Sequence, residues 1–354
     1  MISKSGMNKK ERVRLALSHS EPDRVPKGEI CIEAGIANRL LHSDYPDDYQ
    51  HYERDRKIRE LLKMDYINIG DWPTEFLGID EQGYKHFRSV YGEEFIVAGK
   101  TKRVVHPPIS SIREARSYRV PDIGKVSNEL IRRFSEDNDF FIFAQIGGPV
   151  TVLDETFGME DYLIYTVTNT VEMGILGDKI MEFETEKAKL FLYAGADAVL
   201  IGDDISYNSG PFLPPRIMEE IVFPFYQRTI REIKRYRDVP VLLHSDGNLM
   251  PVFDAIMACG FDGLHSLQPS AGMDIGEIKK RYGDVLCLIG NIDLDYVMTM
   301  STPGEVEKVV KRTIDIAAPG GGYILSTCNA LIDAIPDENA LTMYRTADRY
   351  GLYR

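Results

Sequence analysis

The sequence contains a series of short apolar segments, most of them separated by stretches with the periodicity of amphipathic helices. Eight such segments are centred near residues 29, 68, 143, 199, 242, 264, 287 and 324. Short apolar strands that alternate with helices are typical of a parallel sheet buried on both faces. Eight such units fit a closed (β/α)8 barrel, so we predict an α/β TIM barrel. An open doubly wound sheet is the alternative, but residues 32–37 lack the glycine-rich fingerprint that usually follows its first strand.

Two additions to the barrel are expected. Residues 8–19 have the pattern of an amphipathic helix, and Pro22 and Pro26 end it, which predicts an N-terminal helical extension. Residues 81–99 mix charged residues with aromatic and β-branched ones around Tyr91 and Gly92, a pattern typical of a β-hairpin insertion. We expect residues 1–354 to form a single domain.

The composition excludes several classes of protein. A formal net charge of -13 makes the chain a poor candidate for binding nucleic acid, because a phosphate backbone would repel it. The polar, basic start of the chain is not a signal peptide, and no apolar run is long enough to span a membrane. The cysteines form no CxxC pair and suit a reducing cytoplasm, where we expect the protein to be located. They are Cys31, Cys259, Cys287 and Cys328.

Polar side chains follow the predicted strands. Residues 241–243 form a short apolar strand, and His244, Asp246 and Gly247 come directly after it. The period of two in an extended chain places His244 and Asp246 on the same side. In a barrel of this type the carboxyl ends of the strands form the active site. The polar groups at the other strand ends are Glu33, Asp71, Gln145, Asp203, Asp204, Gln268, Asn291, Asp293, Cys328 and Asn329.

A set of motifs runs through the second half of the chain. They are Asp203-Asp204-Ile205, Pro211-Phe212-Leu213-Pro214-Pro215, His244-Ser245-Asp246-Gly247-Asn248, Gly290-Asn291-Ile292-Asp293, Gly320-Gly321-Gly322-Tyr323-Ile324-Leu325 and Pro336-Asp337-Glu338-Asn339. In these motifs the chain resembles the uroporphyrinogen decarboxylase superfamily. Its pattern is closest to the cobalamin-dependent methyltransferases of the methylcobalamin:coenzyme M type.

The resemblance implies a choice between two activities. Uroporphyrinogen decarboxylases carry an arginine-rich segment near the N-terminus that clamps the carboxylates of the substrate. The corresponding residues 29–35 of this chain include Glu29 and Glu33 and no arginine. They would repel a polyanionic porphyrinogen rather than pair with it. We therefore place a methyltransferase first and a decarboxylase-like carboxy-lyase second.

The resemblance also implies a zinc site. Zinc methyltransferases of the superfamily use His-x-Cys after this strand and a cysteine after the last strand. This chain has His244 and Cys328 in those places, and Asp246 where the first cysteine would be. Histidine, aspartate and cysteine can together hold Zn²⁺ and leave a fourth position for substrate. Because a carboxylate is a harder ligand than a thiolate, the ion would be a stronger Lewis acid.

Each predicted ligand also has a structural interpretation. His244 could be a hydrogen-bonded histidine without a metal, and Asp246 could cap the following helix. Cys328 could be a small buried residue. The metal site therefore depends on a geometry that a sequence does not contain.

The resemblance implies transfer of a methyl group between a small substrate, such as a thiol or methyl ether, and the cobalt of a corrinoid carried by a partner protein. Zinc would activate the heteroatom of the substrate. The predicted catalytic residues are His244, Asp203 and Asp71, and the two aspartates would orient the substrate or relay a proton. The predicted substrate-binding residues are Asp204, Tyr207, Gln145, Gln268, Asn291 and Trp72. A homodimer is usual in the superfamily.

Other interpretations of the site stay open. Asp203 and Asp204 could anchor a loop, and Trp72 and Tyr207 could cover the barrel without touching substrate. A decarboxylase-like lyase of tetrapyrrole synthesis would need no metal, and Asp71 would stabilise a protonated pyrrole. A corrinoid-binding or scaffolding protein without catalysis would bind its cobalamin-carrying partner whatever residue stands at position 244.

Overall fold

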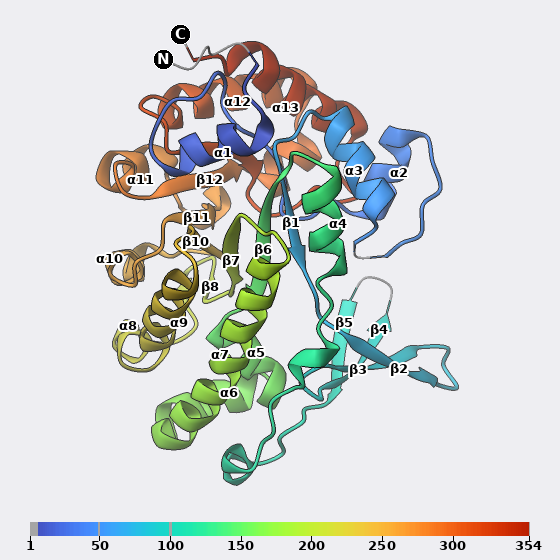
Figure 1. Cartoon of the computed structure of the whole chain (residues 1–354), viewed down its shortest axis with the longest axis vertical. Coiled ribbons are helices and arrows are strands. Elements are labelled where there is room, and N and C mark those ends of the chain that lie inside the picture. The colour runs from blue at the N-terminus through green and yellow to red at the C-terminus, as the bar shows by residue number, and fades with distance from the viewer. Residues whose placement is uncertain (1–5, 49, 99–100, 354) are drawn as a thin grey trace.

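A computed structural model describes residues 6–48, 50–98 and 101–353 (Figure 1). Its centre is a parallel sheet with the strand order β1-β6-β7-β10-β11-β12-β13. The strands are β1 (Tyr66–Gly70), β6 (Phe141–Gly147), β7 (Ala198–Gly202), β10 (Val241–Ser245), β11 (Gly263–Ser266), β12 (Cys287–Ile292) and β13 (Tyr323–Thr327). These strands lie where the sequence predicts them from position 68 onward, and the predicted TIM-barrel-like fold is confirmed.

The segment around Gly28 closes the ring between β13 and β1. The Gly28 amide donates to the Leu325 carbonyl at 3.1 Å, and on the other side the Asp65 amide donates to the Lys27 carbonyl at 2.7 Å. The segment pairs through isolated bridges, so the regular strand predicted near residue 29 is wrong in detail. Gly28 has no room for a side chain, because the Tyr66 ring lies 2.6 Å from the position of a Cβ.

Helices surround the sheet, and α7, α9 and α12 contact its strands. The helices are α1 (Lys9–Leu17), α2 (Ala34–Leu41), α3 (Tyr52–Leu61), α4 (Glu129–Asp137), α5 (Pro149–Phe157), α6 (Met159–Thr168), α7 (Thr170–Tyr193), α8 (Pro215–Ile217), α9 (Phe223–Tyr236), α10 (Phe253–Ala258), α11 (Ile275–Tyr282), α12 (Pro303–Ala317) and α13 (Asp337–Tyr350). Short 3₁₀ or π turns are η1 (Ile112–Arg116), η2 (Ile123–Lys125), η3 (Met218–Val222), η4 (Met250–Val252), η5 (Pro269–Ala271) and η6 (Leu294–Met298).

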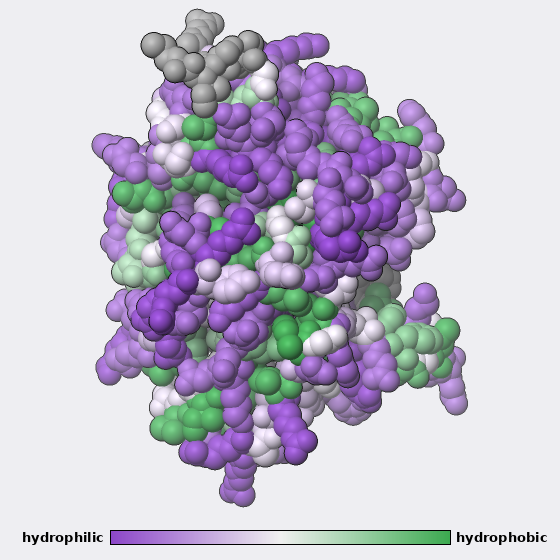
Figure 2. Space-filling model, in the orientation of Figure 1, coloured by the Kyte–Doolittle hydropathy of each residue, from purple (hydrophilic) through white to green (hydrophobic). Residues whose placement is uncertain are grey.

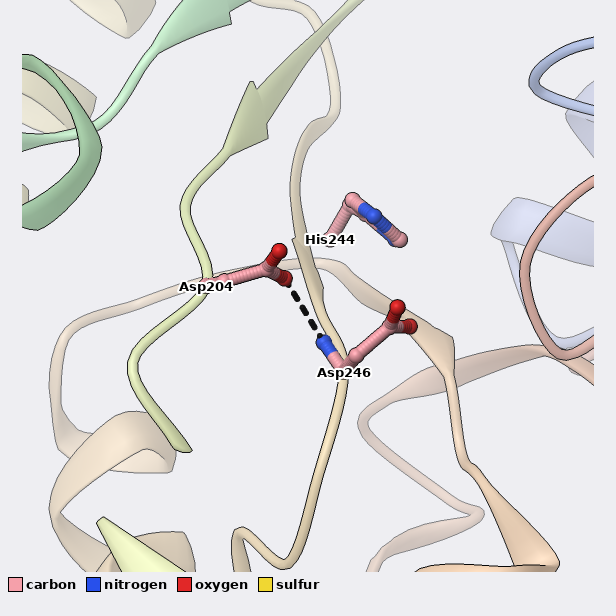
Figure 3. A group of neighbouring side chains, drawn as sticks. All are labelled: Asp204, His244 and Asp246. Atoms are coloured by element: carbon pink, nitrogen blue, oxygen red, sulfur yellow. Dashed lines mark hydrogen bonds between the residues drawn. The ribbon is translucent and has the colours of Figure 1, made fainter. Parts of the chain in front are cut away.

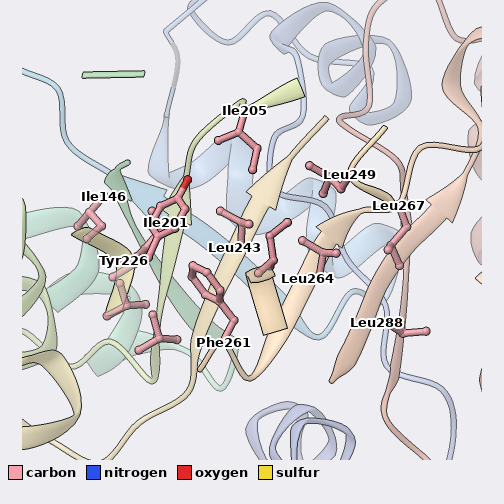
Figure 4. Packing of buried hydrophobic residues seen from close by; sticks show 14 of the residues in the cluster. Ile146, Ile201, Ile205, Tyr226, Leu243, Leu249, Phe261, Leu264, Leu267 and Leu288 are labelled. Atoms are coloured by element: carbon pink, nitrogen blue, oxygen red, sulfur yellow. The ribbon is translucent and has the colours of Figure 1, made fainter. Parts of the chain in front are cut away.

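The main core lies between the sheet and these helices. Leu243 of β10 and Leu264 of β11 are buried in it with Tyr226 of α9 and with Phe261 (Figure 4). The rings of Tyr226 and Phe261 meet edge to face, with centroids 5.3 Å apart. Alternate residues of each strand point outward into this layer, so the remaining ones fill the interior of the ring.

The interior of the ring holds a second apolar cluster, which α1 closes. Val13, Ala16 and Leu17 of α1 are buried in this cluster with Tyr66 and Phe141, the first residues of β1 and β6. The helix therefore covers the amino-terminal end of the barrel, and burial of Val13 alone stabilises the fold by about 1.5–3 kcal/mol. The predicted N-terminal helical extension is confirmed, and residues 1–5 lie outside the described part of the chain.

The predicted β-hairpin belongs to a larger antiparallel sheet with the order β2-β3-β4-β5. Its strands are β2 (Thr74–Ile79), β3 (Lys85–Ser89), β4 (Glu94–Ala98) and β5 (Thr101–His106). Tyr91 and Gly92 lie in the turn between β3 and β4, as predicted, and Gly99 lies outside the described residues. The strands β2 and β5 were not predicted, because side chains on both of their faces are exposed, which leaves little hydrophobic alternation in the sequence.

The sheet β2-β3-β4-β5 projects from the barrel and carries apolar side chains at its surface (Figures 1 and 2). Phe76 and Ile79 of β2 are 56% and 63% exposed. Most of the surface in this view is hydrophilic (Figure 2). None of the helices in the described residues combines the length and the apolar character that a membrane span requires.

Candidate active site

Three polar side chains meet at the carboxyl ends of β7 and β10. His244 lies in β10, Asp246 follows that strand, and Asp204 comes shortly after β7. Because β7 and β10 are hydrogen-bonded neighbours, their ends lie side by side. One ligand atom of each side chain lies within 4.8 Å of the others, and the Asp246 amide donates to Asp204 Oδ1 at 2.9 Å (Figure 3). The structure thus brings His244 and Asp246 together, as the period of the strand predicts.

The two carboxylate oxygens of Asp246 differ in their hydrogen bonding. The Asn329 side-chain amide donates to Asp246 Oδ2. Oδ1 and the neighbouring Ser266 hydroxyl are buried without a well-formed hydrogen bond. Burial raises the pKa of Asp246, whereas His244 lowers it and Asp204 raises it. A buried acceptor without a partner is costly, and a bound cation would stabilise it.

His244 is held from behind by a second histidine that the sequence analysis missed. His244 Nδ1 lies 2.8 Å from His265 Nδ1, and His265 Nε2 lies 3.4 Å from the Ser326 hydroxyl. His265 is fully buried, and burial followed by the nearby His244 lowers its pKa well below the usual value, which keeps it neutral. The two histidines face each other in the register of β10 and β11. Aligning the strands by their carboxyl ends could have revealed this pair.

Cys328, a predicted metal ligand, lies one position after β13 and is 3% exposed. Burial raises the pKa of its thiol to about 12. Among the described residues, the group that could hold a metal consists of Asp204, His244 and Asp246, so Asp204 joins two of the predicted ligands. Asn329, the next residue, contacts Asp246 instead.

Asp203, predicted as a catalytic residue, is 1% exposed and bound on both oxygens. It accepts hydrogen bonds from the Val150 amide at 3.1 Å and the Thr151 amide at 2.6 Å, at the start of α5, and from the Tyr226 hydroxyl. Burial raises the pKa of Asp203 to about 6, and these donors lower it. This arrangement fixes α5 to the end of β7, which is the anchoring role that the sequence left open.

A cavity of about 730 Å³ lies over the carboxyl ends of β1, β6 and β7. It brings together three predicted residues, Asp71, Trp72 and Gln145. The Ser127 amide donates to Asp71 Oδ2 at 2.7 Å, and burial raises the pKa of this carboxylate. In the part of the chain that the structure describes, the lining of this cavity includes acidic and amide side chains and no arginine or lysine.

The similarity to known proteins assigns a family to this chain. The family model of uroporphyrinogen decarboxylase (URO-D) matches residues 91–350. The chain belongs to the uroporphyrinogen decarboxylase family. A methyltransferase structure from Methanosarcina mazei has a similar fold, with a TM-score of 0.77 and 20% sequence identity. The match covers 97% of this chain and 99% of the methyltransferase chain, which supports the barrel fold.

The relatives of this family member are enzymes of two kinds. A methylcobamide:CoM methyltransferase, MtaA of Methanosarcina barkeri, is 26% identical over 217 residues. That match covers 60% of this chain and 59% of the length of the methyltransferase. A uroporphyrinogen decarboxylase of Trichodesmium erythraeum is 22% identical over 277 residues, which cover 72% of this chain and 73% of that protein.

The remaining predicted residues are Gln268 in a loop, Asn291 in β12 and Tyr207 in the short strand β8. Gln268 accepts a hydrogen bond from the Gly247 amide at 2.9 Å, which supports the turn after Asp246. The Asn291 amide donates to the carbonyl groups of Leu267 and Met273, so it joins two loops and is 6% exposed. Tyr207 lies on β8 (Ser206–Tyr207), which pairs with β9 (Gly210–Pro211). It is 54% exposed and stacks on Phe212, with ring centroids 5.8 Å apart.

Proposed function

We propose that this member of the uroporphyrinogen decarboxylase family is a corrinoid-dependent methyltransferase. It would move a methyl group between a small substrate, such as a thiol or methyl ether, and the cobalt of a corrinoid carried by a separate protein. The observation that carries the proposal is the group of His244, Asp204 and Asp246, whose ligand atoms lie within 4.8 Å of one another at the barrel mouth. The relationship to a methylcobamide:CoM methyltransferase supports the same assignment.

The residues present fit a divalent cation. His244 uses Nδ1 to contact His265, which leaves Nε2 for a ligand, and Asp246 Oδ1, with only the nearby Ser266 hydroxyl as a donor, could accept a cation. Three protein ligands and one open position are the usual arrangement of catalytic zinc. Asp204 completes the set in the structure, and Cys328 stays a predicted ligand. Zn²⁺ held there would lower the pKa of a thiol or withdraw charge from an ether oxygen.

The residues of the cavity would bind and orient the substrate. Trp72 offers an apolar wall, and Gln145 offers an amide that accepts a hydrogen bond from Asn68 through Oε1. Asp71 is half-buried, which raises the pKa of its carboxylate, and it would relay a proton to or from the substrate. Asp203 would act by positioning, because it fixes the helix that carries Thr151 into the cavity wall.

A decarboxylase-like lyase is the second candidate, favoured by the match to uroporphyrinogen decarboxylases over most of the chain. Its substrate carries many carboxylates, and binding them calls for arginine or lysine. In the described residues the cavity lining instead contains Asp71 and Glu155. Lys187 lies beside this lining, 4.7 Å from the Trp72 ring, but one lysine is too few to pair with the many carboxylates of a porphyrinogen, which ranks the lyase second.

The proposal is tested with zinc-loaded protein, methylcobalamin and a panel of small thiols, following the absorbance change on demethylation. We expect transfer by the wild type, loss of transfer in His244→Ala, and full transfer in His86→Ala, which alters a histidine of the projecting sheet. Decarboxylation of uroporphyrinogen without methyl transfer would support the lyase instead. Binding of methylcobalamin with no transfer to any thiol would support a scaffolding protein.

A further inference from the structure

We propose that Glu29 acts as a positioning residue for His244, through Ser326 and His265. This chain of hydrogen bonds holds His244 in the tautomer with the proton on Nδ1, so that the lone pair of Nε2 faces the barrel mouth. The inference concerns the same site as the proposed methyltransferase function, and its consequence for metal binding rests on that function. The tautomer of His244 does not depend on the proposed function.

The hydrogen-bonded contacts run from β10 through β11 and β13 to the segment around Gly28. His244 Nδ1 lies 2.8 Å from His265 Nδ1, His265 Nε2 lies 3.4 Å from Ser326 Oγ, and Ser326 Oγ lies 3.1 Å from Glu29 Oε2. The four residues come from β10, β11, β13 and the irregular segment that closes the ring. His265, Ser326 and Glu29 are each 0% exposed, so water does not compete for these bonds.

Glu29 sets the donor-to-acceptor direction of these hydrogen bonds, because donors surround its carboxylate. Its carboxylate accepts from the Thr327 amide at 3.0 Å, from the Thr327 hydroxyl at 2.6 Å and from the Tyr344 hydroxyl, in addition to Ser326. An ionised carboxylate can only accept, so the Ser326 hydroxyl donates to Glu29 and its lone pairs are open to the N–H of His265. Burial raises the pKa of Glu29 to about 7, so at pH 8 the ionised form dominates.

The hydrogen-bond direction at Glu29, together with the hydrogen bond from His265 to the Thr327 backbone, fixes the tautomers of both histidines. A neutral imidazole has one N–H and one acceptor nitrogen. When His265 donates from Nε2 to Ser326, its Nδ1 must accept, and the donor facing it is the Nδ1–H of His244. His244 Nε2 then carries the lone pair, which is the form that binds a metal. Loss of an outer partner of a ligating histidine typically weakens metal binding about 10–100-fold.

Two neighbouring hydroxyl groups provide a matched pair of variants. Ser326→Ala and Thr327→Val each remove one hydroxyl donor to Glu29 Oε2, but Ser326 also contacts His265 and the Thr327 hydroxyl does not. At pH 8 we expect Ser326→Ala to weaken Zn²⁺ binding about 10–100-fold. We expect Thr327→Val to leave the affinity unchanged. Thermal unfolding of both variants checks that the fold is retained.

The tautomer is measured directly from the ¹⁵N chemical shifts of histidine-labelled protein, with the His244 signals assigned by their loss in His244→Ala. In the wild type without metal we expect a proton on Nδ1 and none on Nε2, and a mixture of tautomers in Ser326→Ala. A proton on Nε2 in the wild type would overturn the inference without any variant, as would equal effects of the two hydroxyl variants on the tautomer. If the wild type shows the expected tautomer but binds no Zn²⁺, the proposed metal fails and the role of Glu29 stands.

Discussion

Removal of the Asp203 carboxylate tests whether this residue supports the barrel or the chemistry. In Asp203→Ala the amides of Val150 and Thr151 at the start of α5 lose their acceptor, and the Tyr226 hydroxyl is left buried without one. Loss of a helix cap costs about 0.5–2 kcal/mol, and an unsatisfied buried group costs about 1–3 kcal/mol. We therefore expect the free energy of unfolding to fall by about 3 kcal/mol, the middle of the combined range.

Unfolding in urea, followed by the fluorescence of Trp72, measures this change. The double variant Asp203→Ala/Tyr226→Phe removes the orphaned hydroxyl as well, so it should recover about 1–2 kcal/mol of the loss. Asp204→Ala is the matched control, because its carboxylate is exposed, and it should change the free energy of unfolding by less than about 0.5 kcal/mol. An Asp203→Ala protein with native stability and no turnover would refute this reasoning and support the catalytic role predicted from the sequence.

Three further predictions follow from single contacts. Folding raises the pKa of Glu29 from 4.5 to about 7, so its contribution to stability is fully present below pH 4.5 and is lost as the pH rises through 7. The loss is on the order of 3 kcal/mol, and Glu29→Gln should flatten this pH dependence in urea unfolding. Gly28→Ala should lower the free energy of unfolding by about 1–3 kcal/mol through collision with Tyr66. Gly174→Ala, in open space on α7, should instead raise it by about 0.5–1 kcal/mol, and a loss at both glycines would contradict the packing argument. Asp246→Cys should favour Zn²⁺ over Mn²⁺ relative to the wild type in competition titrations, because a thiolate is the softer ligand; an unchanged preference would place the metal elsewhere.

The strands of the barrel could be predicted because each is a short apolar run, and Leu243 and Leu264 show the pattern of a sheet buried on both faces. The closing segment could not be predicted in detail. Its Lys27 and Glu29 are polar and fully buried, and their partners Asp348 and Tyr344 lie more than 300 residues away in the sequence. Such long-range pairing leaves no local pattern.

The candidate site could be predicted only where it depends on the period of a single strand. The phase of β10 was enough to place His244 and Asp246 on one side, and Asp71 was correctly placed at a strand end. Asp204 was not predicted as a metal ligand, because its place in the group depends on the directions of side chains after the strands end, where the period of two no longer applies. The role of His265 depends on the register between β10 and β11, which the residues of one strand do not determine.

Anomalous diffraction at the zinc absorption edge, from crystals of the zinc-loaded protein, would locate the metal directly. We expect a peak at the barrel mouth, about 2.0–2.2 Å from His244 Nε2 and from an oxygen of Asp246, with Asp204 or Cys328 as a further ligand. Zinc bound elsewhere with this mouth empty, or bound by Cys328 without His244 and Asp246, would contradict this expectation.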